Sequence, residues 1–102
     1  MLLAVDIGNT NIAFGCVDDE DKVLLFERIS TNHNATSAEY ASLIKNILEM
    51  NSFNISDISA AIMSSVVPSV TNTVREAIRK LFKVEVMLAG PGVKTGLNIL
   101  ID

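Results

Sequence analysis

Short apolar runs alternate with polar segments at the start of the chain. The runs at residues 2–5, 12–17 and 23–26 are separated by segments rich in Asn, Asp and Glu. Strands of this length that are joined by short turns are typical of an antiparallel meander. The pattern therefore predicts strands over residues 2–6, 12–17 and 22–30.

A helical pattern follows. The sequence Thr-Ser-Ala-Glu at residues 36–39 matches a capping box, in which the first and fourth residues exchange hydrogen bonds between side chain and backbone. Apolar residues then recur at helical spacing, at Tyr40, Leu43, Ile44, Ile47 and Leu48. We expect a helix that begins at this box and ends near Asn51, with this apolar stripe facing the core.

A strand and a second helix are predicted next. The strand covers residues 58–67 and should stop at Pro68, after which Ser69 can cap the helix. The apolar positions of this helix are Val70, Val74, Ala77, Ile78, Leu81 and Phe82. Its outer side carries Arg75, Glu76, Arg79 and Lys80, followed by Lys83. We interpret this basic group as a solvated face that complements the helix dipole, in preference to an anion-binding site.

The rest of the chain predicts one more strand and a tail. The strand covers residues 84–89, and Gly90, Pro91 and Gly92 turn the chain into residues 93–102, which lack a helical period. The complete order is β-β-β-α-β-α-β, which predicts an α/β fold. Strand–helix–strand crossovers are right-handed, so the last two strands should run parallel to the first.

We expect a mixed five-stranded sheet in the order 3-2-1-4-5, with helices on both faces or mainly on one. In that sheet Asp6 and the pair Ser64 and Ser65 lie at the carboxyl ends of adjacent parallel strands. Ligands bind at this edge of open α/β sheets.

Candidate chemistry lies between the first two strands, at Asp6, Ile7, Gly8, Asn9, Thr10 and Asn11. A carboxylate at the end of a buried strand can hold Mg²⁺ directly or through water. Gly8 allows a tight turn and the close approach of a phosphate, and successive N–H groups of such a turn can cradle phosphate oxygens. The same residues also suit an ordinary hairpin turn, because Gly, Asn and Asp dominate turns.

Composition narrows the class of protein. The 102 residues suit one small domain, and their net charge of −4 argues against a nucleic-acid or anionic-membrane surface. No apolar run approaches the roughly 20 residues of a membrane span. The amino terminus has no basic leader, and Asp6 interrupts its apolar run, so we expect no signal peptide and a cytoplasmic protein. An apolar share of 49% indicates strands covered on both faces or a surface for another domain or subunit.

Three further features have ordinary interpretations. Cys16, the only cysteine, lies inside an apolar strand and is interpreted as a core residue. His33, the only histidine, lies in a polar loop and is interpreted as solvated. Lys94 and Thr95 match the end of a Walker A motif, but Val93 stands where that motif needs glycine and no helix pattern follows. We therefore interpret these two residues as part of a substrate-side or structural loop.

Three separated motifs together resemble one family. They lie at residues 6–11, 64–70 and 91–99, in the same order along the chain as in that family. The set is similar to the amino-terminal half of a type III pantothenate kinase, which has the ribonuclease-H-like fold of the acetate kinase, sugar kinase, Hsp70 and actin superfamily. The resemblance implies transfer of the γ-phosphoryl group of ATP to pantothenate, the committed step towards coenzyme A. It also implies Mg²⁺, a monovalent cation (K⁺ or NH₄⁺) and a homodimer.

The resemblance assigns roles to residues. Asp6 matches the carboxylate expected near Mg²⁺, and the phosphate-cradling turn is matched by Ile7, Gly8, Asn9, Thr10 and Asn11. The family's catalytic base, an Asp in a Gly-Ala-Asp-Arg motif, would lie beyond Asp102. We therefore expect residues 1–102 to be a first half without a catalytic base, truncated before the second half. Two alternatives stay open, namely a non-catalytic regulatory paralogue (of the transcription accessory type) and another small-molecule kinase of the superfamily.

Overall fold

A computed structural model of the chain describes residues 1–89, and the predicted tail at residues 93–102 lies outside this range. The elements are β1 (Leu2–Ile7), β2 (Asn11–Val17), β3 (Val23–Ser30), α1 (Ser37–Met50), the short 3₁₀ helix η1 (Ile55–Asp57), β4 (Ala60–Ser65), α2 (Pro68–Phe82) and β5 (Val86–Leu88). The predicted order of strands and helices is confirmed, and η1 was not predicted.

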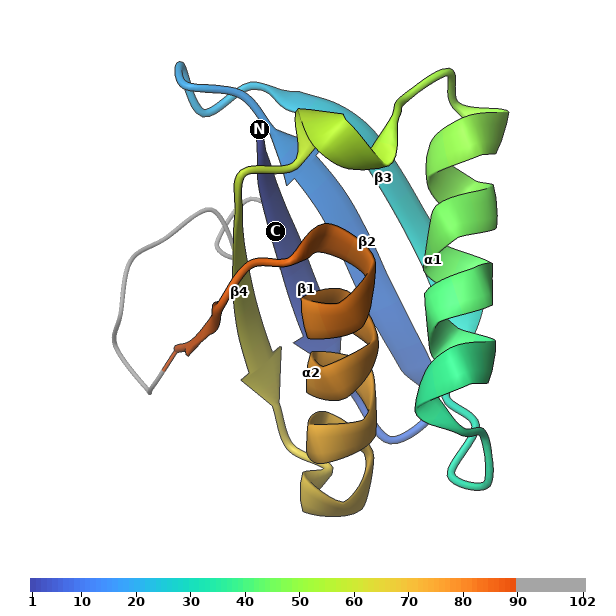
Figure 1. Ribbon diagram of the computed structural model, residues 1–102. Coiled ribbons are helices and arrows are strands. Elements are labelled where there is room, and N and C mark those ends of the chain that lie inside the picture. Colours follow the sequence, from blue (N-terminus) through green and yellow to red (C-terminus); the bar gives the residue numbers. More distant parts are fainter. Residues whose placement is uncertain (90–102) are drawn as a thin grey trace.

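The strands form one mixed five-stranded sheet in the order β3-β2-β1-β4-β5 (Figure 1). The first three strands are antiparallel, and β4 runs parallel to both β1 and β5. This confirms the predicted order 3-2-1-4-5. The parallel ladder pairs Asp6 with Ser64 and Ile7 with Ser65, so these residues end at the same edge of the sheet.

Both helices lie on one face of the sheet (Figure 1). Leu3, Val5 and Ile7 of β1 belong to the same apolar cluster as the buried residues of the helices, which are Tyr40, Ile44, Leu48, Val70, Val74, Ala77, Ile78 and Phe82. Cys16 is also part of this cluster, as predicted, and burial raises the pKa of its thiol to about 11. Of the two arrangements left open, the described residues adopt the one with both helices on one face.

Helix α1 begins and ends as predicted. The Thr36 hydroxyl accepts a hydrogen bond from the Glu39 N–H (3.2 Å), and a Glu39 carboxylate oxygen accepts one from the Thr36 N–H (2.9 Å). This reciprocal pair is the predicted capping box, and Asn51 is the C-cap. The apolar stripe is narrower than predicted, because Leu43 is 41% exposed at the margin of the buried face.

Helix α2 does not use the predicted cap. It begins at Pro68, and its N-cap is Val67, whose side chain cannot accept a hydrogen bond. Proline suits the first helical position because it lacks an N–H and its φ is already helical. Ser69 therefore lies inside the first turn, and the Val67 N–H donates to the Ser65 hydroxyl instead (3.0 Å).

The last two strands are shorter than predicted. β4 begins at Ala60, because η1 occupies the chain just before Ile58. β5 has only three residues, because Lys83 ends α2 in the left-handed conformation (φ 59°) and the next two residues lead from the helix to the sheet. The basic group on α2 is exposed at Arg79, Lys80 and Lys83, but Arg75 is partly buried.

Candidate functional site

Asp6 lies near the end of β1, on the face of the sheet that the helices do not cover. Side chains alternate along a strand, so Asp6 points away from the face formed by Leu3, Val5 and Ile7. Its neighbours across the ladders are Ala13 and Ser64. The Asp6 carboxylate is partly buried and forms no hydrogen bond or ion pair with any of residues 1–89. No described residue therefore competes with a ligand for this carboxylate.

The turn after β1 is closed by a short backbone hydrogen bond. The Gly8 N–H donates to the carbonyl oxygen of Asn11 (2.9 Å). A Cβ atom at Gly8 would lie 3.1 Å from that same oxygen, which is closer than nearly all real Cβ contacts. Glycine is therefore favoured here, because any side chain would require the two backbone segments to separate by a few tenths of an ångström.

Carbonyl groups of this turn accept hydrogen bonds from the loop after β3. The Thr31 hydroxyl donates to the carbonyl oxygen of Gly8 (2.7 Å), and the Thr31 N–H donates to that of Thr10 (2.9 Å). His33 Nε2 lies 3.4 Å from the carbonyl oxygen of Asn9. Because the Asn11 carbonyl accepts from the Gly8 N–H, all four carbonyl groups of residues 8–11 have a hydrogen-bond partner.

Two N–H groups of the turn have no hydrogen-bond partner within residues 1–89. The N–H groups of Asn9 and Thr10 donate to no group within residues 1–89, and both residues are exposed. The Thr10 hydroxyl accepts only a long hydrogen bond from the Asn11 side chain (3.3 Å). Two adjacent N–H donors with a hydroxyl form a site for anionic oxygens, and a free carboxylate beside them can hold a cation that bridges to the same anion.

The two serines at the end of β4 differ in their surroundings. Ser64 lies on the same face as Asp6, is partly buried, and its hydroxyl forms no hydrogen bond within the described part of the chain. The Ser65 hydroxyl accepts from the Val67 N–H and helps the chain leave the strand. Of these two serines, only Ser64 therefore lies on the same uncovered face of the sheet as Asp6.

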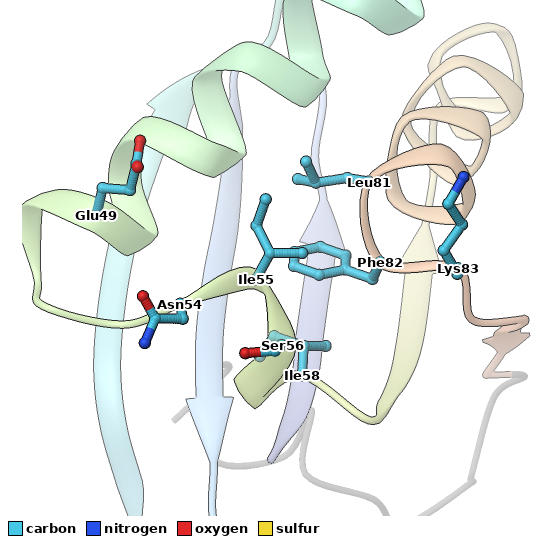
Figure 2. A pocket seen from close by; sticks show the side chains of 8 residues that line it. All are labelled: Glu49, Asn54, Ile55, Ser56, Ile58, Leu81, Phe82 and Lys83. Carbon is cyan, nitrogen blue, oxygen red and sulfur yellow. The ribbon is translucent and has the colours of Figure 1, made fainter.

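A depression of about 580 Å³ lies at the other end of the sheet (Figure 2). Its lining comes from the ends of both helices and from η1, and comprises Glu49, Asn54, Ile55, Ser56, Ile58, Leu81, Phe82 and Lys83. These residues lie at the amino end of β4, whereas Asp6 lies beside its carboxyl end. No candidate residue from the sequence lines this depression, so it is not part of the candidate site.

The metal-binding capacity of the site rests on Asp6. No group of three or more His, Cys, Asp and Glu residues among residues 1–89 is arranged to hold a metal ion. One carboxylate suits Mg²⁺, which in phosphoryl-transfer sites is bound by one or two carboxylates together with substrate phosphates.

None of the helices in the described range is long and apolar enough to cross a membrane.

Comparison with known protein families shows to which family this chain belongs. The profile of the family described as type III pantothenate kinase matches residues 2–102. The chain belongs to the type III pantothenate kinase family. The resemblance that the three motifs indicated is thereby confirmed, although the motif at residues 91–99 lies outside the described structure.

Curated relatives in the type III pantothenate kinase family are much longer than this chain. The type III pantothenate kinase of Bifidobacterium adolescentis is 43% identical over 102 residues, which is all of this chain and 40% of the relative. The enzyme of that name from Shouchella clausii is 37% identical over 99 residues, 97% of this chain and 39% of the relative. The chain thus spans about 40% of the length of these relatives.

Solved structures similar to this chain share its fold. A ROK hexokinase from Thermus thermophilus matches 86% of this chain and 34% of its own, with a TM-score of 0.63 and 14% identity. A Bacteroides thetaiotaomicron protein with an actin-like ATPase fold matches 99% of this chain and 37% of its own, with a TM-score of 0.58 and 12% identity. At such low identity these neighbours support the ribonuclease-H-like fold of this type III pantothenate kinase relative and nothing finer.

The sequence did not single out Thr31. It lies in a polar loop, 23 residues from its hydrogen-bond partner Gly8, and no local motif includes both. The predicted meander contained an indirect signal. Because the third strand pairs with the second, the residue that follows it must lie beside the turn between the first two strands.

Proposed function

We propose that this chain is the phosphate-binding half of a kinase that converts pantothenate to 4′-phosphopantothenate with ATP, the first step of coenzyme A biosynthesis. Membership of the type III pantothenate kinase family supports the substrate and the reaction. The observation that carries the proposal is the pair of N–H groups at Asn9 and Thr10 that are unbonded within residues 1–89, in the turn that follows Asp6.

The roles within the turn follow from its chemistry. Asp6 holds Mg²⁺ directly or through water, and the backbone from Gly8 to Asn11 cradles phosphate oxygens of ATP. Ile7 is fully buried and anchors the turn to the core. In phosphoryl transfer the protein mainly positions the reactants and neutralises charge, which a carboxylate-bound cation and fixed N–H dipoles can do.

The remaining parts of the proposed enzyme are not assigned to this chain. The catalytic base, a second phosphate loop and the site for K⁺ or NH₄⁺ would follow Asp102, because the curated relatives extend well beyond the matched region. We propose a cytoplasmic homodimer by the same family relationship. Residues 1–102 then form the ribonuclease-H-like first half of a longer protein.

The test is pantothenate-dependent ATP consumption by the protein expressed from its whole reading frame. ADP release should require both pantothenate and Mg²⁺, and glucose in place of pantothenate should give none. The chain ending at Asp102, assayed beside it, should be inactive. Mass spectrometry of the product should show one phosphoryl group added to pantothenate.

A different result would redirect the assignment. If the folded protein releases no ADP with pantothenate, the proposal is wrong and the regulatory paralogue becomes the better account. If ADP release depends on another small alcohol, the chain belongs to a kinase of different specificity. K⁺, NH₄⁺ and Na⁺ salts compared in the same assay would test the monovalent cation.

A further inference from the structure

The loop after β3 is hydrogen-bonded to the turn between β1 and β2. Thr31 contributes two hydrogen bonds, from its hydroxyl to the Gly8 carbonyl (2.7 Å) and from its N–H to the Thr10 carbonyl (2.9 Å). The hydroxyl bond is the shorter and is partly buried. His33 lies farther away, with Nε2 3.4 Å from the Asn9 carbonyl, and it is exposed. Thr31 is thus the main contact between this loop and the turn.

A buried tyrosine fixes the position of that loop. The Tyr40 hydroxyl donates to the carbonyl oxygen of Asn32 (2.8 Å) and accepts from the N–H of the same residue (2.9 Å). Tyr40 is only 1% exposed and is packed in the main apolar cluster. Because both backbone groups of Asn32 are held, the preceding residue, Thr31, cannot easily move away from the turn.

The planarity of the peptide bond links these contacts to phosphate binding. In a trans peptide the C=O and the following N–H point in opposite directions within one rigid plane. The Gly8 carbonyl shares its plane with the Asn9 N–H, and the Asn9 carbonyl shares its plane with the Thr10 N–H. A donor that fixes the Gly8 carbonyl therefore fixes the direction of the Asn9 N–H, which is one of the two unbonded donors.

We propose that Thr31 is a positioning residue for ATP, which aims the Asn9 N–H of the turn at the phosphates and is itself held by Tyr40 through Asn32. This inference rests on the proposed phosphate-binding role of the turn. Thr31 need not touch the nucleotide. Its effect should be on the binding and use of ATP, whereas the affinity for pantothenate should be largely unaffected.

Two substitutions at Thr31 separate the hydroxyl from the bulk of the side chain. Thr31→Val keeps the shape but loses the donor, and Thr31→Ser keeps the donor. In the protein from the whole reading frame, Thr31→Val should raise the Kd for Mg·ADP about tenfold, in line with the loss of one hydrogen bond. It should lower kcat/KM for ATP to a similar degree, while KM for pantothenate stays near its wild-type value. Thr31→Ser should restore most of the loss.

Thr71→Val is the matched control. The Thr71 hydroxyl also donates to a backbone carbonyl, that of Val67 (3.0 Å), but it makes no hydrogen bond with the turn. The Thr71→Val variant should have a lower thermal midpoint than the wild type and the same Kd for Mg·ADP.

Tyr40→Phe tests the support of the loop. It removes both hydrogen bonds to Asn32 without changing Thr31, and it should weaken Mg·ADP binding in the same direction as Thr31→Val.

The outcomes distinguish this inference from the proposed function. If Thr31→Val is folded and binds Mg·ADP as the wild type does, Thr31 has no positioning role, whatever the substrate. If the wild type binds Mg·ADP but does not use pantothenate, the proposed substrate is wrong, and the ratio of the Kd values still decides the role of Thr31. If the wild type binds no Mg·ADP, the inference and the phosphate-binding role are both wrong.

Discussion

In the proposed site, Asn9 and Thr10 would bind a phosphate through their backbone N–H groups, so the conformation of the turn should matter more than the side chains at these two positions. The carbonyl oxygens of residues 8–11 all accept hydrogen bonds, from Thr31, His33 and Gly8. These bonds direct the oxygen atoms away from the side on which the Asn9 and Thr10 N–H groups are unbonded. Without these bonds, a phosphate beside the two N–H groups could face carbonyl oxygens, whose partial negative charge would repel it. Because the backbone conformation and not the side chain is expected to matter, substitutions at Gly8 and at Asn9 should have different effects.

Gly8→Ala should weaken phosphate binding more than Asn9→Ala. The added Cβ would lie 3.1 Å from the Asn11 carbonyl oxygen, so the bond that closes the turn must lengthen. We expect the Kd for Mg·ADP to rise about tenfold in Gly8→Ala, which corresponds to one weakened hydrogen bond. Asn9→Ala keeps its N–H and serves as the control. Calorimetric titration measures both, and equal affinities for the two variants would contradict the account.

Asp6→Asn should abolish most turnover without unfolding the protein. The amide has nearly the shape of the carboxylate but lacks the charge that holds Mg²⁺, and Asp6 has no partner within residues 1–89 that would be lost. Removal of a single group that stabilises charge in a transition state costs about 10²- to 10³-fold in kcat, and we expect a loss of at least this size here. The control is Asp19→Asn in the exposed turn after β2. Wild-type turnover in Asp6→Asn would remove this residue from the mechanism.

At the scale of elements, the segments that carry their own signals were predicted well. The capping box of α1 lies within four residues, and the strand–turn–strand pattern of β1 to β3 is equally local. The errors in the bounds of α2 and β5 arose where neighbouring residues carry competing signals. Ser69 seemed a cap until Pro68 took the first helical position, and the length of β5 depends on how Lys83 ends α2. Thr31 was missed for a different reason, because its partner Gly8 lies 23 residues away.

The capping box predicts a stability effect. Thr36→Ala removes the side-chain acceptor for the Glu39 N–H and should lower the free energy of unfolding by about 1 kcal/mol. Urea denaturation monitored by circular dichroism measures this. Ser42→Ala, at an exposed position within the same helix, is the control and should change little. A loss as small as that of the control would mean that the box does not stabilise α1.

The same box predicts a pH dependence. Hydrogen bonds from the Thr36 backbone and side chain lower the pKa of Glu39 below its ordinary value of 4.5. Because the folded pKa is the lower one, this contribution to stability is complete well above pH 4.5 and is lost as the pH falls through the folded pKa. The stability difference between wild type and Glu39→Gln should therefore shrink between neutral pH and about pH 3. A difference that is constant over this range would contradict the prediction.

At the scale of the whole molecule, the sheet order was predictable because crossovers are right-handed and short turns join neighbouring strands. The placement of both helices on one face follows from the same rule, because the crossovers through α1 and α2 lead in the same direction across the sheet, although the sequence analysis left both arrangements open. Both edge strands carry exposed apolar side chains on the described part of the chain. These are Leu24 and Phe26 on β3 and Met87 and Leu88 on β5. Exposed apolar edges favour association.

The chain ending at Asp102 should therefore self-associate when isolated. Sedimentation velocity over a range of concentrations should show a rising mean mass, and Phe26→Lys should reduce that rise because it adds charge to the edge of β3. Met50→Lys changes a side chain that is 83% exposed at the end of α1, outside both edge strands, and should have little effect. A monomer at every concentration would contradict this view of the edges.

The central claim is that the turn between β1 and β2 binds the phosphates of ATP through its backbone. Its most direct test is a titration of the ¹⁵N-labelled protein from the whole reading frame with Mg·ADP, monitored at individual amides by NMR. The account predicts that the Asn9 and Thr10 amides shift most, and that Asp6→Asn reduces these shifts. If Mg·ADP binds without moving them, or moves instead the amides around Asn54 and Lys83 at the opposite end of the sheet, the turn is not the phosphate site.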